Sequence, residues 1–208
     1  MNVLTKKTSA RRLIRLLLTL GALTAMTVPA AAAGAVESGP DEGARQARGG
    51  GCVVAYFDLG ETLVHSAADG SMRYAPGAAE HLRALRARHI PVGLITNVPS
   101  SWGATDAERA AALRKVVDEE WTDSTPFAWS DFDGRILTPR TEAERKPAPV
   151  LWERAREAAG DCRVVFQGEN AEEVRTAGSL GYVAYQVAHA HRPAYLPPRL
   201  IALLAHLP

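Results

Sequence analysis

The chain has 208 residues, of which 24 are basic and 23 are acidic, so its formal net charge at pH 7 is +1. Five of the basic side chains and no acidic one fall within the first 35 residues, which leaves 19 basic against 23 acidic residues, a charge of about −4. A nucleic-acid surface needs clustered lysine and arginine to displace counterions. We therefore expect no nucleic-acid partner.

Residues 1–35 have the composition of a secretory signal peptide. A basic start is followed by an apolar run over residues 16–28, then by Pro29 and four alanines, which is the pattern of such a leader with its cleavage site. The apolar run is shorter than the roughly 20 residues that a membrane-spanning helix needs. We expect cleavage, a secreted or periplasmic location and no stable membrane span afterwards. An uncleaved anchor is the alternative.

The next segment reads as a linker, and the rest of the chain as one domain. Residues 36–51 are rich in glycine, alanine and charge and have no apolar periodicity, which is typical of a flexible connection. Residues 52–208 are numerous enough for a single domain with a sizeable core.

An apolar run that begins at Val53 is the first predicted strand of this domain. The run ends abruptly in Asp58, and a glycine-containing turn follows. In open α/β sheets, ligands gather at the carboxyl ends of the strands, so Asp58 lies where a reactive group is expected. The alternative is that Asp58 only begins the turn or caps a helix.

Strands and helices alternate along the remaining chain. Thr105 and Glu108 have the spacing of a capping box that opens a helix, and Pro149 and Gly160 bracket another helix. We expect helices over residues 77–88, from 105 onward, between 149 and 160 and over 198–206, and strands over residues 90–96, 127–130, 163–167 and 182–187. This alternation predicts an α/β domain.

Four segments in this order resemble the four motifs of the haloacid dehalogenase (HAD) superfamily. The first motif is matched by Asp58, Thr62 and Leu63, but its second aspartate is Gly60 here and its usual glycine is Glu61. The others resemble a strand that ends in Thr96, a lysine before a helix (Lys146), and a strand followed by Gly168, Glu169 and a second acid at Glu173.

The resemblance covers residues 52–208 and implies a fold. It implies a Rossmann-like three-layer domain with a mostly parallel five-stranded sheet, in which the strands lie in the order fifth, fourth, first, second, third. Only 37 residues separate Asp58 from Thr96, so no large cap domain fits between them. A small mobile flap over residues 65–74 is the expected substitute.

The resemblance also implies a chemistry, that of a Mg²⁺-dependent phosphatase which forms an aspartyl-phosphate. Asp58 would attack phosphorus, Thr96 would donate to a phosphate oxygen, and Lys146 would neutralise charge. The substrate would be a small-molecule phosphate ester or an accessible phosphorylated group, contacted by Thr62 and Asn97. The implied ligands of the Mg²⁺ cofactor are Asp58, the carbonyl of Gly60, Glu169 and Glu173.

Two departures from the motifs leave alternatives open. The aspartate that Gly60 replaces protonates the leaving group in the resembled enzymes, and such acid–base help is worth roughly 10²–10⁴-fold. A weakened HAD-like protein that binds a phosphorylated or acidic ligand is therefore the main alternative, and a dehalogenase-type hydrolase is a lesser one. Glu169 is longer than the usual aspartate, and Glu173 also has the spacing of a helix-capping partner of Asn170.

Two further expectations concern cysteine and histidine. In the resembled sheet Cys52 and Cys162 precede neighbouring parallel strands, so we expect a disulfide between them in an exported protein, with two free thiols as the alternative. His189 and His191 are expected at the surface or at the rim of the site rather than as metal ligands.

Overall fold

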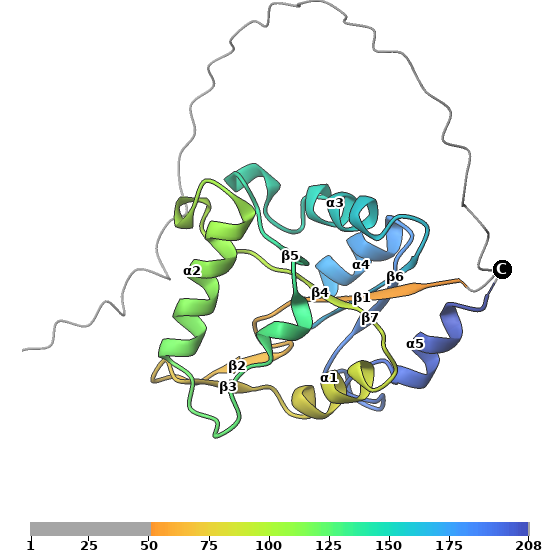
Figure 1. The fold of residues 1–208 in the computed structure, drawn as a ribbon, viewed down its shortest axis with the longest axis horizontal. Coiled ribbons are helices and arrows are strands. Elements are labelled where there is room, and N and C mark those ends of the chain that lie inside the picture. Colours follow the sequence, from red (N-terminus) through yellow and green to blue (C-terminus); the bar gives the residue numbers. More distant parts are fainter. Residues whose placement is uncertain (1–50, 208) are drawn as a thin grey trace, which may run out of the picture. The chain divides into compact units, whose positions relative to one another are not determined.

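A five-stranded parallel sheet forms the centre of residues 51–207, the part of the chain that the computed structural model describes (Figure 1). All four strand pairs are parallel. The order is β5 (Ile136–Leu137), β4 (Val92–Ile95), β1 (Val53–Phe57), β6 (Arg163–Gly168) and β7 (Val183–Gln186). This confirms the predicted α/β class and the predicted strand order. The predicted signal peptide and nearly all of the predicted linker lie outside the described residues.

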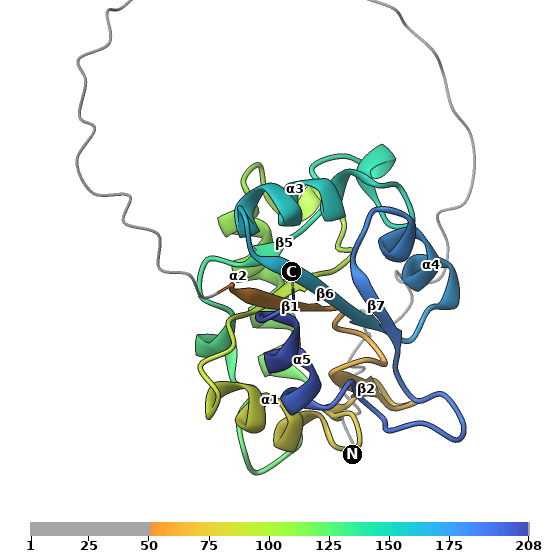
Figure 2. The ribbon, with the colours of Figure 1, turned by 90° about the vertical axis from the view of Figure 1, so that its right-hand side faces the viewer.

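Helices cover both faces of the sheet, because alternate residues of β1 face opposite sides. Ala55 and Phe57 join one buried cluster, and Val54 and Tyr56 join a second cluster. Figures 1 and 2 show α1 and α5 on one side of the sheet and α3 and α4 on the other. The helices are α1 (Ala78–Arg86), α2 (Asp106–Glu119), α3 (Val150–Ala159), α4 (Ala171–Ser179) and α5 (Pro198–Leu204).

The predicted helix starts depend on local side-chain caps. Thr105 and Glu108 form the complete capping box of α2. The Asn170 side chain accepts hydrogen bonds from the first backbone amides of α4. Gly160 ends α3 with a positive φ of 58°, which glycine adopts at little cost. The predicted α2 and α3 helices are therefore confirmed together with their physical causes.

The predicted flap is a β-hairpin made of β2 (Val64–Ser66) and β3 (Met72–Tyr74). Its β3 strand is attached to the chain that follows α2, because the Met72 amide donates to the Glu120 carbonyl and the Met72 carbonyl accepts from the Thr122 amide. The Tyr74 amide also donates to Asp123. The hairpin thus exists as a paired element, and its movement remains a prediction.

The predicted strand over residues 127–130 is wrong. Phe127 lies in a loop and packs against the ring of Trp129 at 4.5 Å, and a 3₁₀ turn, η2, covers Trp129–Phe132. The true edge strand is β5, and it has only two residues. Two further 3₁₀ turns are η1 (Ser100–Trp102) and η3 (Glu142–Glu144). The aromatic run of residues 127–132 therefore fills the core from a loop rather than from the sheet.

A disulfide joins Cys52 to Cys162, which confirms the predicted pairing. The two residues precede β1 and β6, whose register pairs Val53 with Arg163, and their Cα atoms are 4.6 Å apart. The bond therefore lies at the amino edge of the sheet. Among the described residues, no helix is both long and apolar enough to cross a membrane.

Candidate active site

The parallel register brings the ends of three predicted motifs to one edge of the sheet. Phe57 on β1 is level with Leu94 on β4 and with Gln167 on β6. These residues are followed by Asp58 after β1, by Ile95 and Thr96 on and after β4, and by Gly168 and Glu169 on and after β6. The register therefore places Asp58, Thr96 and Glu169 at the same carboxyl edge of the sheet.

Lys146 is the charged centre of this edge. Its Nζ lies 2.6 Å from Oδ1 of Asp58 and 2.7 Å from Oε2 of Glu173. Lys146 is 6% exposed, Asp58 8% and Glu173 9%, so little water screens these ion pairs. The three residues come from the loop before α3, from the end of β1 and from the first turn of α4. The lysine of the third motif is thus in contact with the aspartate of the first motif.

Burial and charge act against each other in the pKa values of these groups. Burial favours the neutral amine of Lys146, but Asp58 and Glu173 outweigh it and raise the Lys146 pKa above its ordinary value. Burial raises the pKa of Glu173, although Lys146 acts in the opposite direction. Burial, with the nearby Asp58 carboxylate, also raises the pKa of Glu169. The edge therefore holds more carboxylates than its one lysine can balance.

Thr62 and Asn97, which were expected to contact the substrate, have other partners in the structure. Thr62 is fully buried; its hydroxyl donates to Oε2 of Glu169 at 2.9 Å and accepts from the Glu169 amide at 3.1 Å. The Asn97 side chain donates to the carbonyl of Lys146 and accepts from the Lys146 amide, at 3.0 and 2.8 Å. Thr62 therefore orients Glu169, and Asn97 holds the backbone of Lys146.

The altered first motif leaves an open position at Gly60. A Cβ atom placed on Gly60 would meet no heavy atom within 4 Å. The neighbouring Glu61 does not fill this space, because its carboxylate accepts from the Ser66 amide at 3.0 Å and lies 2.8 Å from Nδ1 of His65. Glu61 thus ties the turn to the hairpin, and it does not take the position of the missing acid.

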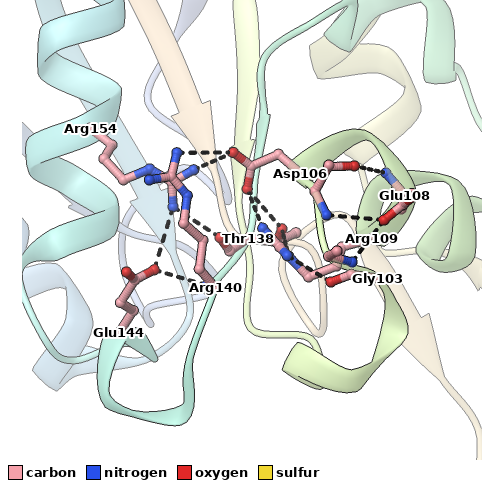
Figure 3. A network of polar contacts seen from close by, with 10 residues as sticks. Gly103, Asp106, Glu108, Arg109, Thr138, Arg140, Glu144 and Arg154 are labelled. Atoms are coloured by element: carbon pink, nitrogen blue, oxygen red, sulfur yellow. Dashed lines mark hydrogen bonds and ion pairs between the residues drawn. The ribbon is translucent and has the colours of Figure 1, made fainter.

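A partly buried polar network holds the loop that carries Lys146, and the sequence did not reveal it (Figure 3). Asp106, in the first turn of α2, lies 2.6 Å from Nη2 of Arg109 and 2.5 Å from Nη2 of Arg154 on α3. Arg154 also donates to the Thr138 carbonyl and pairs with Glu144. The Asp106–Arg109 spacing could have indicated a local pair, but the partners from α3 and the loop have no local signal.

The carboxylates at this edge suit a hard cation in part. Mg²⁺ is usually held by one or two carboxylates together with waters and substrate phosphates. Asp58 and Glu169 supply two adjacent carboxyl groups with excess negative charge. Glu173, expected as a further ligand, is instead paired with Lys146, and the described residues hold no group of three or more His, Cys, Asp or Glu fit for a metal. Of the carboxyl groups at this edge, Asp58 and Glu169 are therefore the two whose charge Glu173 and its pairing with Lys146 leave in excess.

Comparison with known proteins gives a likeness of fold. The chain matches no protein-family model, and a search of curated proteins finds no match. An uncharacterized protein from Listeria monocytogenes serotype 4b is similar with a TM-score of 0.50 and 14% identity, over 74% of this chain and 99% of that chain. A candidate HAD-like phosphatase from Mesorhizobium loti has a TM-score of 0.47 and 16% identity, over 74% and 88%. The first likeness extends to the fold alone.

Proposed function

We propose that this protein is an exported, HAD-like phosphatase that hydrolyses phosphate monoesters with the help of Mg²⁺. The observation that carries the proposal is the buried Asp58–Lys146 pair at the carboxyl edge of the parallel sheet. A carboxylate there can attack an electrophile, and a lysine beside it can balance the charge of an anionic substrate. The leader composition and the disulfide support export, because disulfides persist in oxidising compartments.

In the proposed reaction, the Asp58 carboxylate attacks phosphorus and the bond from phosphorus to the ester oxygen breaks, which leaves an aspartyl-phosphate. The departing alkoxide takes a proton from water, because Gly60 supplies no acid, and water then hydrolyses the aspartyl-phosphate to inorganic phosphate and free Asp58. Lys146 holds Asp58 in place and offsets the charge that collects around the phosphoryl group. Thr96 donates a hydrogen bond to a phosphate oxygen, and Thr62 fixes the orientation of Glu169. Bound Mg²⁺, held by Asp58, the Gly60 carbonyl and Glu169, would supply Lewis-acid polarisation of the phosphoryl oxygens.

The test of this proposal is the exchange Asp58→Asn in the mature domain. We expect metal-dependent turnover of phosphate esters to be lost, together with the beryllofluoride adduct that the wild type forms and that ¹⁹F NMR detects. The control is Asp133→Asn, an exposed aspartate at the end of η2, which should keep wild-type turnover. Full activity of Asp58→Asn with an unchanged melting curve would refute the nucleophile.

A second candidate function rests on Gly60, which leaves the first motif without its second aspartate, the usual proton donor. In this alternative the protein binds a phosphorylated or acidic ligand at the same edge without turning it over. Assays of binding and of turnover on the wild type separate the two functions. A wild type that binds 3-phosphoglycerate but hydrolyses none of a broad panel of phosphate esters, with or without Mg²⁺, would favour the binding protein.

A further inference from the structure

The loop between β7 and α5 is cationic in an otherwise acidic domain. Residues 188–194 contain His189, His191 and Arg192, all of them exposed, and the sequence from 174 to 208 contains no aspartate or glutamate. The proposed reaction uses none of these three side chains. Their place in the fold therefore decides what they can do.

The loop begins beside Glu169. The register of β6 and β7 pairs Gly168 with Gln186, and the amide of Val187 donates to the Gly168 carbonyl at 3.0 Å. The Gln186 side chain donates to the carbonyl of Glu169 at 3.0 Å. Residues 188 onward therefore leave β7 at the carboxyl edge of the sheet, level with the proposed active site.

The loop returns beside the turn that follows Asp58. The Tyr195 hydroxyl donates to the Thr62 carbonyl at 2.6 Å, and the Leu196 amide donates to Oε1 of Gln167 at 2.8 Å. Figure 2 shows the loop after β7 extending to the same end of the sheet as the β2 hairpin. Both ends of residues 188–194 are thus anchored to the backbone or side chains around the active site.

Arg192 packs against the strand from which this loop leaves. Its guanidinium lies 5.0 Å from the centre of the Tyr185 ring, and its Nη2 is 3.5 Å from the Gln186 carbonyl. A guanidinium on an aromatic face keeps its fork of N–H donors available to a planar anion. The ring of Tyr185 is itself held, because its hydroxyl donates to the Pro193 carbonyl at 2.5 Å.

Charge complementarity indicates which kind of substrate group residues 188–194 would bind. At the buried edge one lysine is set against three carboxyl groups, so an anion that approaches Asp58 meets an excess of negative charge. A cationic loop next to this edge favours a substrate with a further negative group outside the reacting phosphate. Arginine binds carboxylate and phosphate oxygens through the same paired N–H groups.

We propose that residues 188–194 bind a second anionic group of the substrate, so that the preferred substrates are phosphate esters whose alcohol portion carries a carboxylate or another phosphate. This proposal rests on the proposed phosphatase function and names its substrate class. Arg192 is the principal contact, and His189 and His191 add donors along the same loop.

The test compares two substrates that share a skeleton, glycerol 3-phosphate and 3-phosphoglycerate, which differ by a carboxylate. Arg192→Ala should lower kcat/KM for 3-phosphoglycerate by roughly 10-fold or more, mainly through KM, and leave glycerol 3-phosphate within about 2-fold. Propane-1,3-diol monophosphate and its bisphosphate repeat the comparison with a second phosphate. The control is Arg88→Ala, an exposed arginine before β4 at the opposite edge.

Equal loss for both members of a pair, or no loss, would overturn the loop's role even if the protein is a phosphatase. Binding decides the matter if no ester is hydrolysed. In titration calorimetry on the Asp58→Asn protein, the added exchange Arg192→Ala should weaken the binding of 3-phosphoglycerate more than the binding of inorganic phosphate. Equal weakening of both ligands, or none, would overturn the proposal independently of catalysis.

Discussion

At the scale of single residues, Lys146 organises the proposed active site through contacts that are far apart in the sequence. The Lys146 ammonium lies within 2.7 Å of carboxylate oxygens of both Asp58 and Glu173, and the Asn97 amide holds its backbone on both sides. A lysine in this setting has few rotamers left. The position of its charge is therefore fixed before any substrate arrives, which is a form of preorganisation.

Gly60→Asp should restore a proton donor to the site. The position has open space for a side chain, and its φ lies outside the left-handed region, so aspartate fits without strain. We expect kcat to rise by roughly 10-fold or more for alkyl phosphates, whose leaving groups need a proton, and little for p-nitrophenyl phosphate. Steady-state kinetics with both esters measure the difference.

Gly60→Asn is the matched control for this gain, because it adds the same shape without an acid. It should leave both rates near those of the wild type. An equal rise with both esters, or the same rise in Gly60→Asn, would mean that shape rather than proton transfer limits the reaction.

His81 should make folding stability depend on pH. It is 7% exposed, it stacks on Tyr195 and it meets the edge of Phe57, and burial lowers its pKa to about 4. The His81 pKa in the folded protein is below the unfolded value of about 6.5. The stability that His81 contributes is therefore fully present above pH 6.5 and is lost as the pH falls toward 4. The loss from this group should reach about 3 kcal/mol.

Urea unfolding at pH 7 and pH 4.5, in the wild type and in His81→Gln, isolates this contribution. The carboxylates titrate in both proteins. The difference between the two proteins in how the free energy of unfolding changes with pH therefore comes from His81. The variant should show the shallower slope, and identical slopes would contradict the account.

At the scale of elements, the sequence predicted those parts whose causes are local. The capping box of α2, the Asn170 cap of α4 and the apolar runs of β1 and β6 all depend on neighbouring residues, and all are present. The edge strand was misplaced for a physical reason. Phe127 and Trp129 resemble strand residues because they are large and apolar, whereas β5, with two residues, is too short for any periodicity to show.

The network around Asp106 connects three elements that no local pattern relates. It joins the start of α2 to Arg154 on α3 and to the loop after β5 (Figure 3). Although burial acts in the other direction, hydrogen bonds and charges from Arg154 and Arg109 lower the Asp106 pKa, so the carboxylate stays ionised. This network is the support of the loop that leads to Lys146, and its partners lie up to 48 residues apart.

Asp106→Asn should therefore destabilise the domain and loosen the Lys146 loop. Arg109 is 1% exposed, and it would lose the charge that offsets its burial, which should lower the free energy of unfolding by about 2–4 kcal/mol. Urea unfolding measures the loss, and faster amide exchange over residues 138–146 locates it.

Glu119→Gln is the control at the other end of α2. Its partner Lys115 is 3.9 Å away and both side chains are exposed, so the change should be below about 0.5 kcal/mol. A comparable loss in both variants, or unchanged exchange at the loop in Asp106→Asn, would argue against a supporting role for the network.

At the scale of the whole molecule, the Cys52–Cys162 bond closes a long stretch of chain. The two cysteines are 110 residues apart in the sequence. A loop of this length corresponds to about 5 kcal/mol of stabilisation in the chain-entropy description. We expect the double exchange of both cysteines to serine to lower the free energy of unfolding by about that amount without loss of the proposed phosphatase activity.

Wild-type protein treated with a thiol reductant provides the check, since it should unfold at the same urea concentration as the double variant. Two alkylatable thiols in the untreated protein, or equal stability of the oxidised and serine forms, would contradict this contribution.

The Cys52–Cys162 bond also determines where a pulling force on the N-terminal side enters the fold. Cys52 directly precedes β1, so tension arriving from the chain before it passes at once into a covalent junction with the start of β6. The two central strands of the sheet would share the pull at their amino ends, while Asp58 and Glu169 lie past their opposite ends. A force applied through the N-terminal side would therefore load the amino edge of the sheet, opposite the edge at which Asp58 and Glu169 lie.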